Sequence, residues 1–225
     1  MSTHIRKSGM HINIFIPTWN RPKLLLQTIS SIIKSTYKDY SIIVIVDGNL
    51  KLVDLLIKQP VMIIVNPENR DWVYSMNKGL RLAVSDAAMY ASDDLVFDPN
   101  CLSVAAATLK EKYPDGNGLI GINQTVVGCS SAFGLMGRKF IDYFPNRQVF
   151  CPDYIHLASD FELGKYARAN NIFHYCKEAV MNHHRPKDET WQRVAKIKDR
   201  DLQLQIRRAE KGLIWGNSWE RLNAR

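Results

Sequence analysis

Two adjacent carboxylates, Asp93 and Asp94, follow directly after an apolar run in the stretch MYASDDLVFD. Two acids held together at the end of a buried strand repel each other unless a cation or a set of donors neutralises them. A hard divalent cation shared with substrate phosphates would satisfy both acids. A helix N-cap is the alternative, but it would use one aspartate and leave the other unexplained. The pair therefore predicts a metal- and diphosphate-binding site.

Polar residues also follow the other strand-like runs in the first half of the chain. The first three runs are followed by Thr18, Asp47 and Asn66, just as the fourth run is followed by the acidic pair. Ligands of open α/β sheets bind outside the carboxyl ends of the strands. Asp47-Gly48 by itself also fits an ordinary turn. Because four successive strand ends carry such residues, we expect them to line one crevice.

A histidine pair and a later aspartate are further candidates for chemistry. Adjacent residues of an extended segment point to opposite sides, so at most one of His183 and His184 is expected to reach a given site. If the chain returns to the crevice there, it would supply an imidazole to the metal and Arg185 to a phosphate; the alternative is a surface turn. Asp160 stands where a helix begins, which suits either an N-cap or a general base.

The elements that must position these residues alternate regularly in the first half. Strands that are apolar nearly throughout, separated by segments of helical periodicity, indicate βαβ units and a parallel sheet covered on both faces. Pro22 suits the first turn of the first helix. The predicted strands are Ile12–Ile16, Ile42–Val46, Val61–Val65 and Ala87–Ala91.

The second half has a mixed character. Helices are predicted over residues 99–113 and 160–169, and strands over Leu119–Asn123, Ser131–Met136 and Ile172–Cys176. After Pro186 the chain becomes strongly charged and helical in pattern. We interpret this segment as an amphipathic helix that packs on the core through Val194, Ile197, Leu202 and Ile206. The alternative is a nucleic-acid-binding tail that uses Trp191, Trp215 and Trp219.

The bulk composition describes an ordinary globular protein with a basic surface. The 225 residues carry a formal charge of +8, which favours phosphate-bearing partners without selecting among nucleotides, nucleic acids and lipids. Four widely spaced cysteines argue against a disulfide framework or zinc site. No apolar run is long enough for a spanning helix. We expect a cytoplasmic protein, with peripheral membrane contact left open.

Three stretches resemble one known family, and they occur in its motif order. IFIPTWNRPKLLLQTISSIIKSTYKDYSIIVIVDGN resembles the amino-terminal signature of the family-2 glycosyltransferases, which have the GT-A fold. NRDWVYSMNKGLRLAVSDAAMYASDDLVFDPNCL is similar to the stretch in which an asparagine-glycine helix precedes the metal-binding aspartates. SDFELGKYARANNIFHYCKEAVMNHHR is similar to the catalytic-base helix and its downstream histidine.

The resemblance covers about residues 12–185 and implies a fold and an organisation. The fold would be α/β and GT-A-like: a Rossmann-type, mostly parallel central sheet flanked by helices, with a smaller mixed acceptor-side region and a C-terminal helical tail. Residues 1–185 would form the glycosyltransferase domain, with a nucleotide-sugar half at about 10–100 and an acceptor half at 101–185. Residues 186–225 would form a basic helical extension.

The resemblance also implies roles on the donor side. Thr18 and Arg21 would lie by the nucleotide, and Asp47 would recognise the base. Asn77 and Lys78 would sit close to the donor, which would be a nucleoside-diphosphate sugar. A UDP-sugar is the expected donor.

The remaining roles concern the metal and the reaction. Asp94 would be the principal ligand of Mn²⁺ or Mg²⁺, with Asp93 closer to the sugar or ribose. His183 or His184 would complete the metal shell. Asp160 would deprotonate the acceptor hydroxyl for in-line attack with inversion, so that no covalent enzyme intermediate is needed.

Two departures from the family pattern bear on these roles. Ala91 stands where the family often has an aspartate two positions before the pair, which places more of the metal binding on Asp94. Ser159 replaces the glutamate that commonly precedes the base. Asp153 is therefore a competitor of Asp160 as the base, or a residue that binds the acceptor or donor sugar.

The sequence thus predicts a metal-dependent inverting glycosyltransferase. One alternative is a nucleotidyltransferase on a related scaffold, but no glycine-rich, lysine-bearing phosphate loop follows the first strand. The other is a nucleic-acid-binding protein or a nucleic-acid-modifying glycosyltransferase. The acceptor could be a glycan, a lipid-linked glycan, a protein or a nucleic acid. Neither the donor sugar nor an oligomeric state follows from the residues.

Overall fold

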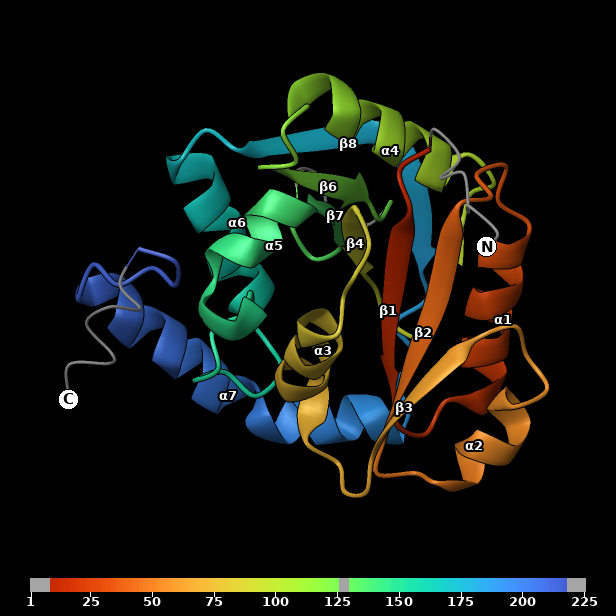
Figure 1. Cartoon of the computed structure of the whole chain (residues 1–225). Coiled ribbons are helices and arrows are strands. Elements are labelled where there is room, and N and C mark those ends of the chain that lie inside the picture. Colours follow the sequence, from red (N-terminus) through yellow and green to blue (C-terminus); the bar gives the residue numbers. More distant parts are fainter. Residues whose placement is uncertain (1–8, 126–129, 218–225) are drawn as a thin grey trace.

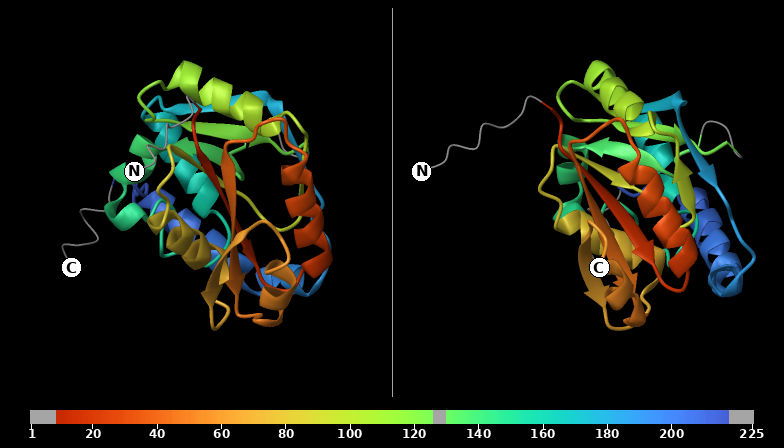
Figure 2. Two further views of the ribbon diagram at one scale, coloured as in Figure 1. Left: turned by 45° about the vertical axis from the view of Figure 1, so that its right-hand side comes forward. Right: turned by 90° about the vertical axis from the view of Figure 1, so that its right-hand side faces the viewer.

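The computed structural model describes residues 9–125 and 130–217, and its centre is an eight-stranded sheet (Figure 1). The strand order is β3-β2-β1-β4-β7-β6-β8-β5. Helices cover both faces, as can be followed in the two views of Figure 2. This confirms the predicted α/β architecture with a mostly parallel central sheet.

The first half of the chain forms the parallel part of the sheet. The sheet has β1 in the middle of this part, in parallel register with β2 on one side and β4 on the other, and β2 pairs in parallel with β3. A helix after each of β1, β2 and β3 returns the chain to the opposite end of the sheet, where the next strand begins. The elements are β1 (Ile12–Thr18), α1 (Pro22–Ile33), β2 (Tyr40–Asp47), α2 (Lys51–Leu56), β3 (Met62–Asn66), α3 (Asp71–Arg81) and β4 (Ala87–Tyr90).

The second half adds the antiparallel and mixed part. β7 pairs antiparallel with β4 and β6, β8 runs parallel to β6, and the short β5 pairs antiparallel with β8. The elements are β5 (Leu95–Phe97), α4 (Cys101–Lys112), β6 (Leu119–Asn123), β7 (Gly134–Gly137), α5 (Arg138–Tyr143), a 3₁₀ turn at Pro145–Arg147, α6 (Ser159–Ala169) and β8 (Phe173–His183).

Two of these strands differ from the prediction in ways that matter for the site. Residues 95–97 are a strand, so the acidic pair stands in the link between β4 and β5 and not at a helix start. The strand expected at Ile172–Cys176 continues to His183, past a register shift opposite Ile122 and Asn123. Because Leu95 pairs with His183, this extension brings the histidine segment beside the acidic pair.

The core consists of two apolar layers, one on each face of the sheet. Along β1, Ile12, Ile14 and Ile16 face the layer built with α1, α2 and α4, whereas Phe15 faces the layer built with α3, α5 and α6. The period of two follows from the pleat of the strand. A strand buried on both faces reads as a continuous apolar run, and this is why β1 shows no polar alternation.

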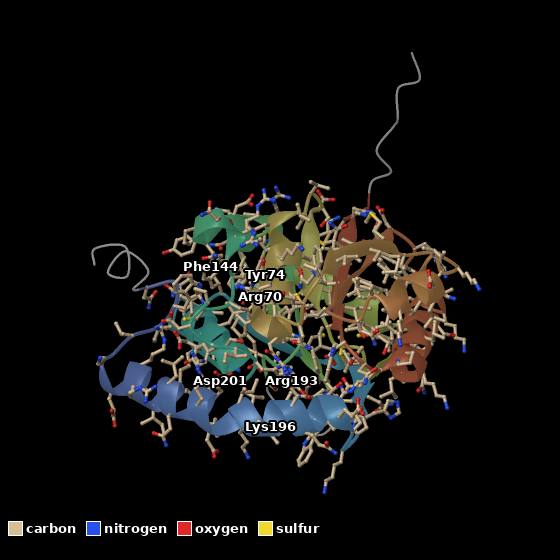
Figure 3. All side chains as sticks on the ribbon, turned by 90° about the horizontal axis from the view of Figure 1, so that it is seen from below. Arg70, Tyr74, Phe144, Arg193, Lys196 and Asp201 are labelled. Atoms are coloured by element: carbon tan, nitrogen blue, oxygen red, sulfur yellow. The ribbon has the colours of Figure 1, made fainter. Side chains whose placement is uncertain are left out.

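The charged segment after Pro186 forms the long helix α7 (Glu189–Glu210). Asp188 is its N-cap and accepts a hydrogen bond from the backbone N–H of Trp191 at 3.0 Å. The helix lies along the end of the sheet where β1 to β3 finish (Figure 1), and Figure 3 shows Arg193 and Asp201 on the side of α7 that faces the rest of the protein. Ile206 is about half exposed, so the predicted packing through this residue is wrong.

Within the described ranges, no helix has both the length and the apolar composition needed to cross a lipid bilayer. Cys101, Cys151 and Cys176 are buried free thiols. Cys129 and Trp219 lie outside the described residues.

Candidate functional site

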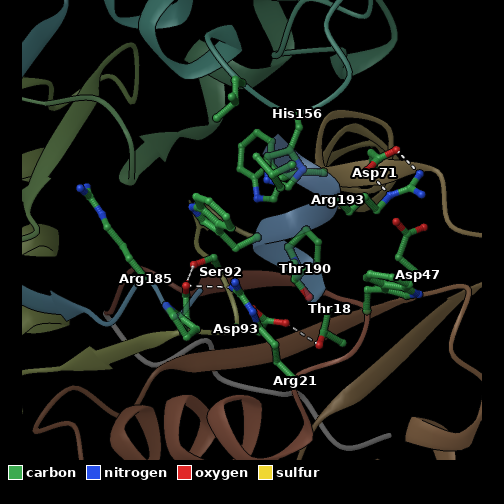
Figure 4. Close-up of a pocket in the computed structure, with 18 of the residues that line it drawn as sticks. Thr18, Arg21, Asp47, Asp71, Ser92, Asp93, His156, Arg185, Thr190 and Arg193 are labelled. Carbon is green, nitrogen blue, oxygen red and sulfur yellow. Dashed lines mark hydrogen bonds and ion pairs between the residues drawn. The ribbon is translucent and has the colours of Figure 1, made fainter. Parts of the chain in front are cut away.

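A cavity of about 520 Å³ opens at the carboxyl ends of the parallel strands (Figure 4). Its walls come from the ends of β1, β2 and β4, from the end of β8, from the loop before α6 and from the first turns of α7. A volume of this size is typical of small-ligand sites. Seven of the eleven predicted site residues line it: Thr18, Arg21, Asp47, Asp93, Asp94, Asp160 and His183.

Asp93 is buried at the floor of this cavity. It accepts hydrogen bonds from Thr18 Oγ1 at 2.8 Å and from Arg21 Nη1 at 3.2 Å. Burial raises the pKa of Asp93 to about 6, and the neighbouring Asp94 adds to this effect, while the charge of Arg21 opposes it. Ionisation of this carboxylate in the β4–β5 link thus costs free energy. The guanidinium of Arg21 and the hydroxyl of Thr18 hold it in place.

Asp94, its neighbour, has the opposite electrostatic character. Burial alone would raise its pKa, but His183, Arg21 and Ser92 together lower the pKa of Asp94 to about 2. Arg21 Nη1 lies 2.9 Å from Asp94 Oδ2, His183 Nε2 lies 3.3 Å from Oδ1, and the hydroxyl of Ser92 donates to the same carboxylate. Asp94 is therefore an anion over the whole physiological range.

Arg21 supplies the positive charge that the acidic pair requires. Its guanidinium contacts both carboxylates. It also donates two hydrogen bonds to Asp188, the N-cap of α7, at 2.8 and 3.1 Å. Burial alone would lower the pKa of Arg21, but Asp188 and the two carboxylates raise it, so the guanidinium stays charged. The arginine joins the β4–β5 link to the start of α7.

The cavity residues can hold a divalent cation only together with ligands from a bound substrate. Among the residues that the structure describes, no group of three or more histidine, cysteine or acidic side chains is arranged around a common metal position. Asp94 and His183 provide one carboxylate and one imidazole at 3.3 Å from each other. A cation here would need further ligands from a bound diphosphate, as is usual for phosphate-bearing substrates.

Asp47 lies at the far side of the cavity, at the end of β2. It accepts hydrogen bonds from Asn66 Nδ2 at 2.8 Å and from the backbone N–H of Arg70 at 3.0 Å. Burial raises its pKa, and these donors oppose the change. Both donors bind Oδ1, so they fix the position of the Asp47 carboxylate and leave Oδ2 able to accept a hydrogen bond from a ligand.

Asp160 reaches the cavity from the first turn of α6. The N-cap of this helix is Ala158, so the interpretation of Asp160 as an N-cap residue is wrong. Burial raises the pKa of Asp160, while the backbone N–H groups at the helix start oppose the shift. A carboxylate with a raised pKa at a cavity wall has the properties of a general base.

The other four predicted residues lie away from the cavity. Asn77 exchanges two hydrogen bonds with the backbone of Phe150, and Lys78 donates to Val65 O and Asn66 Oδ1, so both hold neighbouring segments together. These contacts follow from helix α3, whose inner face packs against the sheet.

Asp153 and His184 are also outside the cavity. The Asp153 carboxylate is about half exposed and pairs with Arg208 Nη1 at 3.1 Å. His184 is exposed, and its backbone N–H donates to Asp94 O at 3.0 Å. Adjacent residues of an extended chain point to opposite sides, so His183 faces the acidic pair and His184 does not.

Several cavity residues were not predicted from the sequence. α7 contributes Thr190, Trp191, Arg193 and Lys198. Arg193 binds the Asp71 carboxylate through Nε and Nη2, at 2.9 and 2.6 Å. The sequence signals the helix start at Asp188 but contains no local sign of where the helix lies. Two further lining residues, Trp72 and His156, likewise depend on long-range packing.

A mostly parallel sheet with acidic residues at its carboxyl edge and a mixed second half is the arrangement of GT-A glycosyltransferases. The sequence profile described as "Glycosyl transferase family 2" matches residues 13–142, which is more than half of the chain. The chain belongs to this family.

Solved structures with the same fold bind nucleotide sugars. The S. aureus TarS 1-349 structure in complex with UDP-GlcNAc has a TM-score of 0.67 at 14% identity, over 80% of this chain and 60% of that chain. The mannosyltransferase PcManGT from Pyrobaculum calidifontis, in complex with GDP-Man and Mn²⁺, has a TM-score of 0.63 at 13% identity, over 82% and 60%. At these identities the likeness concerns the fold.

One characterised relative matches the chain in sequence. The glucosyl-dolichyl phosphate glucuronosyltransferase of Haloferax volcanii is 26% identical over 125 residues. The match covers 52% of this chain and 39% of that protein. The chain therefore spans only part of the length of its relatives.

Proposed function

We propose that this protein transfers a sugar from a nucleoside-diphosphate sugar, with a UDP-sugar as the expected donor, to an acceptor hydroxyl, with a divalent cation and with inversion at the anomeric carbon. The observation that carries the proposal is the single cavity in which Asp47, the Asp93–Asp94 pair, His183 and Asp160 meet. The nucleotide-sugar complexes of proteins with the same fold support it.

In this proposal the donor binds along the strand ends. Asp47 accepts from the base, and Thr18 and Arg21 lie by the diphosphate and the acidic pair. A bound cation would stabilise the departing nucleoside diphosphate by neutralising its charge. The mixed ligand set of Asp94 and His183 suits Mn²⁺, because Mg²⁺ strongly prefers oxygen ligands.

A metal-binding role for His183 Nε2 requires the ring proton to sit on Nδ1. Arg185 Nε donates to Nδ1 at 3.0 Å, so in this state the proton sits on Nε2, which faces Asp94. Gln124 Oε1 lies 3.2 Å from Nδ1 and can accept a hydrogen bond from a protonated Nδ1 once Arg185 turns to a phosphate. A metal-bound histidine needs such a partner for its second nitrogen.

The reaction itself needs one proton acceptor. The acceptor hydroxyl oxygen attacks the anomeric carbon, the bond from that carbon to the diphosphate oxygen breaks, and the hydroxyl proton passes to Asp160. The raised pKa of Asp160 suits it to take this proton and later release it. Because attack is on the face opposite the leaving group, the configuration inverts.

Thermal denaturation with donor nucleotides tests the proposal. UDP-GlcNAc, UDP-glucose and GDP-mannose are each added with and without Mn²⁺. At about 100 times the Kd, a true donor raises the Tm by roughly 5–10 °C. Asp94→Asn loses the Mn²⁺-dependent part of the shift, while the exposed control Asp54→Asn keeps it. If none of these or other nucleotide sugars shifts the Tm with metal present, the proposal is wrong.

A further inference from the structure

His156 lies in the cavity wall opposite the acidic pair (Figure 4). Its Nδ1 atom is buried and has no hydrogen-bond partner among the residues that the structure describes, and the same is true of Thr190 Oγ1 on α7. Buried polar atoms without a partner are rare, because each one costs free energy. Two of the three such atoms in the described residues, the third being Ser159 Oγ, belong to side chains of one cavity wall, where a bound molecule can provide their partners.

The imidazole of His156 is uncharged at neutral pH. Burial lowers the pKa of His156 to about 4, and the charges of Asp71 and Asp201 only partly oppose this. An uncharged imidazole can exchange one hydrogen bond with a hydroxyl but offers no charge to a diphosphate. The group therefore suits a neutral, hydroxyl-bearing ligand.

Asp201 on α7 fixes the loop that carries His156. Its carboxylate is fully buried and accepts three successive backbone N–H groups, from Ile155 at 3.1 Å and from His156 and Leu157 at 2.8 Å each. Successive N–H groups that converge on one anion form a rigid nest. Asp201 does not line the cavity, so its carboxylate acts there through the loop that it binds and not by direct contact.

We infer that Asp201 is a positioning residue that holds the loop at residues 155–157 so that His156 Nδ1, together with Thr190 Oγ1, binds hydroxyl groups of a saccharide acceptor. The inference rests on the proposed glycosyl transfer. His156 precedes Asp160, the proposed base, by four residues, whereas the groups proposed for the donor come from the strand ends. The exposed indole of Trp191 in the same wall offers a flat apolar surface to a sugar ring.

Asp201→Asn is the direct test, with Asp199→Asn as the matched control, because Asp199 is an exposed acid on the same helix. The substrates are the donor found by thermal shift and, as acceptor probes, the methyl glycosides of glucose, mannose and N-acetylglucosamine. Asp201→Asn raises the KM for the glycoside about tenfold, with a smaller change in kcat, because a lost hydrogen bond weakens binding by about this factor. Donor hydrolysis by water stays within about twofold, and Asp199→Asn leaves both constants unchanged.

Variants of His156 provide an independent arm. His156→Asn keeps a polar atom near the position of Nδ1 and retains part of the glycoside affinity, whereas His156→Leu loses it. Neither change removes the backbone groups that bind Asp201, so this arm remains decisive if Asp201→Asn does not fold. A second readout is the ¹⁵N spectrum of the imidazoles. The signal that is missing in His156→Asn belongs to His156, and addition of the glycoside to the wild-type protein should shift this signal.

The outcomes separate the inference from the proposed function. If no donor shifts the Tm or is hydrolysed, the proposed function is wrong and the inference falls with it. If the donor is bound and hydrolysed but the glycoside KM is the same in wild type, Asp201→Asn and His156→Leu, the inference alone is overturned. Equal losses in donor hydrolysis and glycoside transfer also overturn it, because they would indicate a general structural role.

Discussion

At the scale of single residues, the acidic pair is governed by Arg21. The expectation that two adjacent carboxylates need a cation is met within the protein by a guanidinium that contacts both. A divalent cation would have to share these carboxylates with Arg21 or displace it. Because Arg21 also binds Asp188, any movement of the arginine affects the start of α7. The pair is thus linked to a helix almost one hundred residues further along the chain.

We predict that Arg21→Gln makes the protein depend on metal for stability. Removing one partner of a buried ion pair costs about 3–5 kcal/mol, because the remaining charges are left uncompensated. Mn²⁺ then replaces part of the lost charge, so it raises the Tm of Arg21→Gln more than that of wild type. Tm values in EDTA and in Mn²⁺ measure this, with Arg207→Gln, an exposed change on α7, as control. An equal Mn²⁺ effect in all three proteins would contradict the prediction.

His156 gives a pH dependence of stability whose sign is fixed. Its pKa is lowered from 6.5 to about 4 in the folded protein, so the unfolded chain binds the proton more readily. The contribution is fully present above pH 6.5 and is lost as the pH falls toward 4, to a total of about 3 kcal/mol. Urea unfolding at pH 7 and at pH 4.5 should show that His156→Asn loses less stability on acidification than wild type. The same loss in both proteins would show that folding does not lower the pKa of His156.

For the base, Asp160→Asn should reduce transfer by a factor of about 10²–10⁴ and leave donor binding intact. The reason is that an amide cannot take the hydroxyl proton, while its shape is nearly the same. Asp153→Asn is the comparison, because Asp153 lies outside the cavity and pairs with Arg208. Steady-state transfer and donor thermal shifts measure the two effects. Transfer that survives in Asp160→Asn and fails in Asp153→Asn would move the role to Asp153.

At the scale of elements, α7 is held at several points along its length, the Arg193–Asp71 pair among them. Asp188 binds Arg21 at its start, Asp201 binds the loop before α6 at its middle, and Arg208 is buried near its end. Each contact joins α7 to a segment that reaches the cavity or to α6. The helix therefore forms a wall of the site, which its sequence pattern alone does not reveal.

The last of these contacts allows a double-mutant test. Glu162 of α6 is buried and accepts hydrogen bonds from Tyr154, Arg208 and the backbone of Trp215. Glu162→Gln leaves the buried Arg208 charge with only the half-exposed Asp153 as its partner, so the free energy of unfolding falls by about 3 kcal/mol. Arg208→Met combined with Glu162→Gln should cost clearly less than the sum of the single changes, as measured by urea unfolding. Strict additivity would show that the two groups do not interact.

At the scale of the whole molecule, the basic charge is partly used inside the protein. Arg193 and Arg208 of α7 pair with Asp71, Asp153 and Glu162. These pairs favour packing of the segment on the core over a role as a nucleic-acid-binding tail. The interpretation as a packed helix agrees with the structure in this respect, although Ile206 is exposed.

We predict that a chain cut after residue 185 does not fold as an independent unit. The cut removes Asp201, Arg208 and Trp215, so three backbone N–H groups before α6 lose their acceptor and the buried Glu162 keeps only Tyr154 as a partner. Each buried group left without a partner costs about 1–3 kcal/mol, which together approaches the stability of a typical domain. Circular dichroism melting of the shortened chain tests this. A sharp cooperative transition near the Tm of the full chain would contradict the prediction.

The sequence by itself determined the parts of this protein that depend on neighbouring residues. The alternation of strands and helices is set by local periodicity, and the position of Asp93 and Asp94 after a strand is a matter of adjacent residues. The same holds for Asp47 at the end of β2. Family resemblance then added the expected roles.

Tertiary structure decided which of these residues share one cavity. Asn77 and Lys78 were expected at the donor, yet their hydrogen bonds tie α3 to other segments. The choice of His183 over His184 required the pairing of β8 with β5. His156 lines the cavity on a loop that binds Asp201, 45 residues later. Such contacts join residues far apart in the chain, and no local pattern encodes them, because they arise only when the packed core brings the segments together.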